Sequence, residues 1–175
     1  MTGITEISEI GEQASDAPEA AGMGGAAGAG AVTRVVVHFD DLDALGMLHN
    51  SRYAVLFERA MIGWWTERGV TWAKGRPSTP DAFNVVREYA ITFHTPVRGT
   101  GEIAVRFWLE RMGSSSADYR FQVVSTDGET VYAEGRRVNI RLDPATMRPA
   151  PWTDHGRAIA SELIRAPKSA APAQR

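Results

Sequence analysis

The 175-residue sequence contains no cysteine. Disulfide bonds, thiolate metal sites and a cysteine nucleophile are therefore excluded together. No apolar run approaches the roughly 20 residues that a helix needs to span a bilayer, and the N-terminal residues lack the basic-then-apolar order of a secretory signal peptide. We therefore expect a cytoplasmic protein that has no membrane partner.

The sequence also lacks a charge excess of either sign. Its 19 Lys and Arg residues nearly balance its 21 Asp and Glu residues, which gives a net charge of -2. Nucleic-acid-binding domains usually have a clear basic excess, so a nucleic-acid partner is not expected. The G-x-S-x-G elbow of α/β-hydrolases and the glycine-rich phosphate-binding motifs are absent as well. We therefore expect neither a serine hydrolase of that class nor a nucleotide cofactor, and no other cofactor is expected.

Composition divides the chain into three parts. Residues 1–31 are rich in alanine and glycine, and residues 166–175 have a similar character. Such segments cannot bury enough apolar surface to offset the entropy of ordering them, so both are predicted to be disordered tails. Residues 32–165 are predicted to form a single folded domain, which is long enough to bury a substantial core.

Hydrophobic periodicity predicts one strand, one helix and four more strands, in that order. Residues 33–39 are rich in β-branched side chains, whereas residues 51–68 are apolar around most of a helical circumference and end before Gly69. Beyond residue 82 the apolar residues alternate with a period of two, and Asp127-Gly128 is typical of a hairpin turn. These patterns predict an α+β fold, with an antiparallel sheet of about five strands wrapped around one helix and a meander of the last four strands.

A cluster of carboxylates precedes the predicted helix, at Asp40, Asp41 and Asp43. A carboxylate can act as a nucleophile or general base at an electrophilic carbon, and free N–H groups at a helix start can stabilise a developing oxyanion. Seven residues separate Asp43 from Asn50 at the expected helix start, and Gly46 would ease the bend between them. Asp43 and Asn50 together could therefore form a minimal site for attack on an activated acyl group.

The same residues have two other interpretations. In the first, which spacing alone favours, Asp43 makes only a loop hydrogen bond and Asn50 or Ser51 only caps the helix. In the second, the three aspartates and His49 bind a hard metal ion. No helical histidine pair or further acidic cluster accompanies them, so no metal site is expected.

A longer pattern extends beyond the acidic cluster. The motif Asp43-x-x-Gly46-x-x-x-Asn50-x-x-Tyr53, continuing into Phe57-Glu58-Arg59-Ala60, resembles the opening of the 4-hydroxybenzoyl-CoA thioesterase-like family of hot-dog-fold acyl-CoA thioesterases. Three later segments support the resemblance: a strand end that contains Pro96, the stretch Gly113-Ser114-Ser115-Ser116, and the closing VNIRLDPATMRPAPW. The resemblance covers roughly residues 34–153.

The resemblance implies a fold, a reaction and a set of site residues. It implies a hot-dog fold, paired into a homodimer or homotetramer with active sites at the subunit interface. It further implies hydrolysis of an acyl-CoA thioester to free acid and coenzyme A, with Asp43 as nucleophile or as base for water and the Asn50 amide polarising the carbonyl. The positions that correspond to substrate-binding residues are Gly46, His49, Tyr53, Arg111, Ser114, Ser115 and Ser116.

Two other functions fit the same resemblance. One is a non-catalytic protein that binds acyl-CoA or an acyl carrier, because a shared fold does not by itself establish catalysis. The other is a thioesterase that acts on an acyl group held by a carrier protein. The identity of the acyl group does not follow from the sequence.

Overall fold

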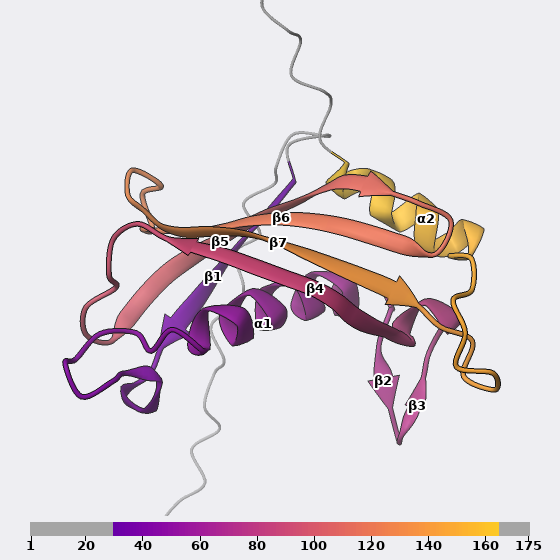
Figure 1. Ribbon diagram of the computed structural model, residues 1–175, viewed down its shortest axis with the longest axis horizontal. Coiled ribbons are helices and arrows are strands. Elements are labelled where there is room, and N and C mark those ends of the chain that lie inside the picture. Colours follow the sequence, from indigo (N-terminus) through magenta and orange to yellow (C-terminus); the bar gives the residue numbers. More distant parts are fainter. Residues whose placement is uncertain (1–29, 165–175) are drawn as a thin grey trace, which may run out of the picture.

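The computed structural model describes residues 30–164 (Figure 1). Residues 1–29 and 165–175, which hold nearly all of the two predicted tails, lie outside this range. Within residues 30–164, no helix combines the length and apolar character needed to cross a membrane.

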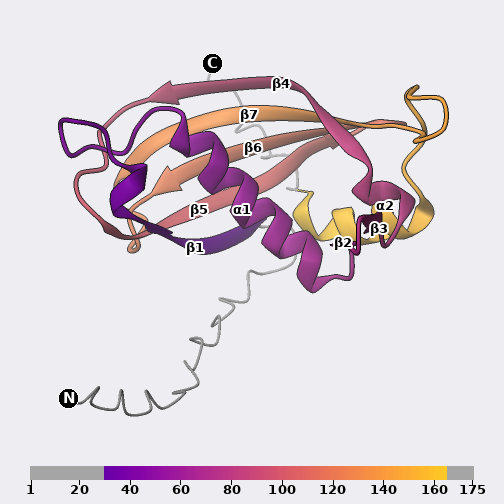
Figure 2. The same ribbon diagram turned by 90° about the horizontal axis from the view of Figure 1, so that it is seen from below.

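Five strands form one antiparallel sheet. They are β1 (Ala31–Val37), β4 (Asn84–Phe93), β5 (Gly101–Met112), β6 (Ser116–Val124) and β7 (Val131–Arg141). Their order across the sheet is β1-β5-β6-β7-β4, and Figure 2 shows β1 and β4 at its two edges. The predicted α+β fold, with a five-stranded antiparallel sheet and one helix against it, is confirmed.

The predicted four-strand meander is wrong, because β4 does not pair with β5. The side of β5 that a meander would give to β4 is occupied by β1, which pairs from Ala31 opposite Phe107 to Val37 opposite Gly101. Strand β4 pairs with β7 at the other side of the sheet instead. Consequently β4 is an edge strand, and the segment after Phe93 must cross the end of the sheet to reach β5.

Helix α1 (Arg52–Glu67) lies across one face of the sheet (Figure 2). It differs from the predicted helix by one residue at each end. Its buried residues recur at the three- and four-residue spacing of a single helical face; they are Tyr53, Leu56, Phe57, Ala60, Met61 and Trp64. Phe57 stacks on Phe121 of β6 at a centroid distance of 4.4 Å. The opposite side of the helix is not covered within one chain, since Ile62 remains 51% exposed.

Short elements cover the two ends of the sheet. The turn η1 (Phe39–Asp41) precedes α1, whereas the β2 (Trp72–Ala73) and β3 (Arg76–Pro77) hairpin and η2 (Pro80–Ala82) follow it. Helix α2 (Asp154–Ala160) and η3 (Ser161–Leu163) close the described chain. Figure 1 places the hairpin and α2 at the same end of the sheet, away from the η1 segment.

The burial of Tyr89 on β4 can be tested by measuring how the free energy of unfolding depends on pH. Its buried hydroxyl has no hydrogen-bond partner among residues 30–164, and burial raises the pKa of Tyr89 to about 12. An unfolded tyrosine titrates near pH 10, so the un-ionised Tyr89 supports the fold fully below about pH 10 and progressively less as the pH rises toward 12. Tyr89→Phe should therefore lose less stability than the wild type over this range.

Urea unfolding at a series of alkaline pH values measures this difference. At neutral pH the same substitution should change the free energy of unfolding by no more than about 1 kcal/mol, because it removes a hydroxyl that forms no bond. If the free energy of unfolding of Tyr89→Phe falls as steeply as that of the wild type between pH 10 and 12, the loss of stability does not come from ionisation of Tyr89.

Candidate active site

The loop between η1 and α1 is held closed by Asp43. Its Oδ1 accepts hydrogen bonds from the backbone N–H groups of Leu45, at 2.8 Å, and Met47, at 3.0 Å. Its backbone N–H donates to the Met47 carbonyl at 2.7 Å, and Gly46 takes the left-handed conformation, with φ of 71°, that the turn requires. Asp43 thus makes the loop bonds of the simpler interpretation, but through one oxygen only. Within residues 30–164, Oδ2 has no hydrogen-bond partner and is available to a ligand.

The loop is also attached to the segment that joins β4 to β5. The Leu48 N–H donates to the Val97 carbonyl at 2.9 Å, and the Gly99 N–H donates to the Gly46 carbonyl at 3.0 Å. These bonds hold the Asp43 loop against the end of the sheet and next to the start of α1.

Asn50, just before the start of α1, has an amide without an acceptor among residues 30–164. The Arg52 N–H donates to the His49 carbonyl at 2.8 Å, and the Ser51 N–H donates to His49 Nδ1 at 3.2 Å. The Ser51 side chain does not cap the helix; its Oγ lies 2.9 Å from the same His49 nitrogen. In the part of the chain that is described, the exposed Asn50 forms no backbone or side-chain hydrogen bond. A free N–H at a helix start is the kind of donor that stabilises a carbonyl oxygen as it gains negative charge.

His49 is held in one tautomer by these contacts. Because its Nδ1 accepts the Ser51 N–H, a neutral His49 carries its proton on Nε2. Its exposed ring can therefore donate a hydrogen bond from Nε2 while Nδ1 stays attached to the helix start.

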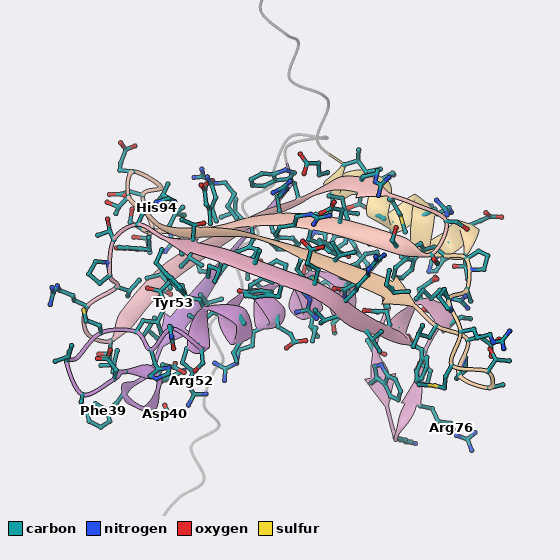
Figure 3. The ribbon with its side chains drawn as sticks, in the orientation of Figure 1. Phe39, Asp40, Arg52, Tyr53, Arg76 and His94 are labelled. Atoms are coloured by element: carbon teal, nitrogen blue, oxygen red, sulfur yellow. The ribbon has the colours of Figure 1, made fainter. Side chains whose placement is uncertain are left out.

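Asp43, His49 and Asn50 line one pocket, of about 440 Å³, which we call the Asp43 pocket. The other lining residues come from the loop, from α1 and from the end of β4; they are Met47, Leu48, Tyr53, Phe93, His94, Thr95 and Pro96. Figure 3 shows Tyr53 and His94 at this end of the sheet. The structure thus brings together Asp43, His49, Asn50 and Tyr53 of the predicted site, while Gly46 shapes the loop behind them.

The β4 side of the Asp43 pocket is aromatic and partly polar. Tyr53 meets Phe93 edge to face at a centroid distance of 5.1 Å, and burial raises the pKa of Tyr53, so its hydroxyl stays protonated at neutral pH. His94 Nε2 lies 3.3 Å from a Glu134 carboxylate oxygen. The sequence pattern places Phe93 and His94 on a strand, but it does not indicate that this strand ends beside the helix start. That contact depends on the pairing of β4 with β7.

Arg111 and Ser114–Ser116 lie at the other end of the sheet. Ser116 is opposite Ile140 on β7, and Ile140 is opposite Val85, near the beginning of β4. Phe93 in the Asp43 pocket is at the end of the same strand. A strand rises about 3.3 Å per residue, so roughly 25 Å separates the two regions. Within a single chain these predicted contacts and Asp43 do not form one site.

The other two acids of the cluster have different surroundings. Asp41 is only 2% exposed; it accepts the His38 N–H at 3.0 Å and lies 3.4 Å from Arg52 Nε. Asp40 is exposed, and its backbone carbonyl accepts a hydrogen bond from Arg52 Nη2 at 3.1 Å. Among residues 30–164, no group of three or more histidine and carboxylate side chains is arranged to hold a metal ion.

Comparisons with known proteins give one family match and a set of similar solved structures. The family model described as the thioesterase-like superfamily matches residues 37–160. No curated protein matches the chain. Several solved structures do, and they extend over most of the described residues.

Three of these structures illustrate the range of similarity. The PA5185 protein of Pseudomonas aeruginosa is 21% identical with a TM-score of 0.68, covering 77% of this chain and 92% of its own. A thioesterase from Thermus thermophilus, complexed with coenzyme A and Zn, is 26% identical with a TM-score of 0.62, covering 75% and 92%. DHNA-CoA thioesterase from Staphylococcus aureus is 18% identical with a TM-score of 0.59, covering 69% and 78%. At their low identities, the first and third show the shared fold alone.

Proposed function

We propose that this chain, which belongs to the thioesterase-like superfamily, is an acyl-CoA thioesterase that reacts in the Asp43 pocket. One observation carries the proposal: Asp43 and Asn50 line the same pocket, and within residues 30–164 one carboxylate oxygen of Asp43 and the amide of Asn50 have no hydrogen-bond partner. A nucleophile or base next to an oxyanion donor is the minimum that attack on a thioester needs.

Each group has a role in this proposal. The two loop amides bound to Oδ1 fix the Asp43 carboxylate and leave Oδ2 to face the substrate. In one route, Oδ2 attacks the thioester carbon, the C–S bond breaks with loss of the coenzyme A thiolate, and water opens the resulting anhydride to release the acid and restore the carboxylate. In the other route, Oδ2 takes a proton from the attacking water, and the C–S bond breaks as the tetrahedral intermediate collapses to the acid and the thiolate. In both routes the thiolate takes up a proton, and the Asn50 N–H donates to the carbonyl oxygen while it is negative.

Two subunits supply a complete site in this proposal. Strand β4 is an edge strand whose outer side is unpaired among residues 30–164, and it has exposed apolar side chains at Val85, Val86 and Phe93. Antiparallel pairing of two such edges puts the Phe93 end of one β4 next to the Asn84 end of the other. The Asp43 pocket of one chain then lies near Arg111 and Ser114–Ser116 of its partner. These residues are proposed to contact coenzyme A, the ligand of the similar Thermus thermophilus thioesterase.

A dimer of this kind is directly measurable. Light scattering should give about twice the 19.0 kDa mass of the chain, or four times if two dimers associate. Val86→Lys, which places a charge on the β4 edge, should shift the mass toward the monomer and reduce activity together. The matched change on the opposite edge, Val32→Lys on β1, should leave the mass unchanged; Val32 is 47% exposed, close to the 48% of Val86. A monomeric wild type with full activity would contradict the shared site.

The reaction itself is tested with a panel of thioesters. Release of free thiol is measured with aryl-CoA and fatty-acyl-CoA substrates, and with the same acyl groups attached to a carrier protein. We expect release from at least one CoA thioester, and faster release from the CoA form than from the carrier form. Release from the carrier form alone would indicate a carrier-protein thioesterase. Tight binding of acyl-CoA in calorimetry without any thiol release would indicate a binding protein.

A further inference from the structure

We infer that Arg52 is a positioning residue of the proposed active site. Its side chain ties the first turn of α1 to the η1 segment, and it thereby holds the Asp43 carboxylate and the Asn50 amide at the separation that the reaction needs. Arg52 does not line the Asp43 pocket, so we expect it to act through these two residues and not on the substrate. The inference rests on the proposed function, but one of its two experimental readouts needs no thioester.

Arg52 closes a segment that contains both reactive groups. It is the first residue of α1, two residues after Asn50. Its Nη2 donates to the backbone carbonyl of Asp40 at 3.1 Å, and its Nε lies 3.4 Å from Asp41 Oδ1. Asp40 and Asp41 come shortly before Asp43 in the chain, and Figure 3 shows Arg52 next to Asp40. One guanidinium therefore joins the chain just before Asp43 to the chain just after Asn50.

The buried Asp41 keeps this guanidinium in place. Asp41 is 2% exposed, and its Oδ2 accepts the His38 N–H at 3.0 Å, so its carboxylate is fixed. A buried carboxylate is strongly destabilised without a compensating cation, and among residues 30–164 only Arg52 lies within salt-bridge distance of it. Ion pairs between freely moving surface side chains contribute little. Arg52 differs, because its partner is held in place and requires its charge.

Asn50 depends on this link because its own N–H is not held. The His49 N–H donates to the Asp41 carbonyl at 2.9 Å, and the Arg52 N–H donates to the His49 carbonyl at 2.8 Å. Asn50 lies between these two bonded residues, and its N–H has no acceptor within residues 30–164. The direction of that N–H is therefore determined by His49 and Arg52. Loss of the Arg52 side-chain contacts loosens both of the bonds that hold them.

Loss of a positioning residue should lower kcat and leave KM nearly unchanged. A displacement of about 1 Å in a reacting group can lower a rate by about a hundredfold, and the backbone bonds that remain limit the displacement here. We therefore expect Arg52→Gln to lower kcat for the best CoA thioester of the panel about tenfold, with KM within about twofold of the wild type. An arginine that binds the substrate would instead raise KM when it is replaced.

Two further variants separate position from charge and from folding. Arg52→Lys keeps a cation for Asp41 and therefore keeps the fold, but one ammonium cannot replace both Nε and Nη2. Its kcat should lie between those of Arg52→Gln and the wild type. Arg59→Gln is the matched control, because Arg59 is exposed further along the same helix and forms no ion pair among residues 30–164. Its kcat should stay within about twofold of the wild type, and thermal unfolding checks that each variant is folded.

Hydrogen exchange measured by NMR provides the readout that needs no thioester. The His49 N–H, whose bond to the Asp41 carbonyl closes the segment, should exchange about tenfold faster in Arg52→Gln and at the wild-type rate in Arg59→Gln. If the wild type releases no thiol from any thioester, the proposed function fails, and this exchange rate alone decides whether Arg52 holds the segment closed. An unchanged His49 exchange rate, a raised KM with an unchanged kcat, a wild-type kcat in Arg52→Lys, or equal losses in Arg52→Gln and Arg59→Gln would overturn the inference.

Discussion

Asp43→Asn is expected to lower kcat/KM for thioester hydrolysis by about three powers of ten or more, the usual effect of removing a nucleophile or general base. The substitution separates chemistry from structure. An asparagine oxygen can still accept the Leu45 and Met47 N–H groups that Asp43 Oδ1 binds, at 2.8 and 3.0 Å. The loop therefore keeps its shape, while the group that replaces Oδ2 can neither attack a carbonyl nor take a proton.

The control for this experiment lies three residues earlier. Asp40→Asn makes the same chemical change at an exposed side chain whose carboxylate has no partner among residues 30–164. It should leave the rate within about twofold, as do most surface substitutions away from a site. Rates are measured by thiol release, with thermal unfolding to confirm that each variant is folded. Wild-type activity in Asp43→Asn, or an equal loss in both variants, would remove Asp43 from the mechanism.

Asp81→Ala is expected to have the largest effect on stability, a loss of about 3 kcal/mol or more in the free energy of unfolding. Asp81 is 2% exposed; it accepts the Thr153 N–H at 3.0 Å and the Thr153 hydroxyl, and it lies 3.5 Å from Arg141 Nε. Removing its carboxylate leaves the Thr153 N–H without its acceptor, and it leaves the largely buried Arg141 without its anionic partner, with only the Pro80 and Pro151 carbonyls as acceptors. It also detaches α2 from η2, because Thr153 caps that helix.

Urea unfolding measures this loss. Asp154→Ala is the control, since Asp154 is exposed, directly follows Thr153 and lies in the first turn of α2. Its removal should cost no more than about 0.5 kcal/mol. Similar losses for the two substitutions would show that Asp81 is not the anchor of this region.

The sequence predicts best those features that depend on neighbours along the chain. The spacing of apolar residues predicts helix α1. The loop between Asp43 and the start of α1 is short, so it keeps Asp43 close to the helix start. The position of β4 is harder to predict. It depends on whether β1 or β4 pairs with the outer side of β5, and no local sequence pattern distinguishes the two strands. The burial of Asp41 and its 3.4 Å contact with Arg52 Nε also depend on the fold, and no sequence pattern distinguishes Asp41 from the exposed Asp40.

A pocket beside the second half of α1 shows the same limit more clearly. Arg137 and Trp152 come from separate parts of the chain, and only the folded sheet places them around this one cavity. Arg111 and Ser114–Ser116 depend on still more distant information, since their predicted role requires a second copy of the chain. Sequence resemblance indicated these positions; the register of one chain places them far from Asp43.

The two hydrogen bonds that tie the Asp43 loop to the β4–β5 connection also determine when the site can exist. The partners, Leu48 with Val97 and Gly46 with Gly99, are far apart in sequence. A folding chain therefore cannot assemble the reactive geometry from the loop and α1 alone; β5 must first bring the 97–99 segment into place. The Leu48 and Gly99 amides should consequently exchange with deuterium at a common rate, set by a single opening event. We expect an opening of this kind to disrupt the proposed site while the sheet and α1 remain folded.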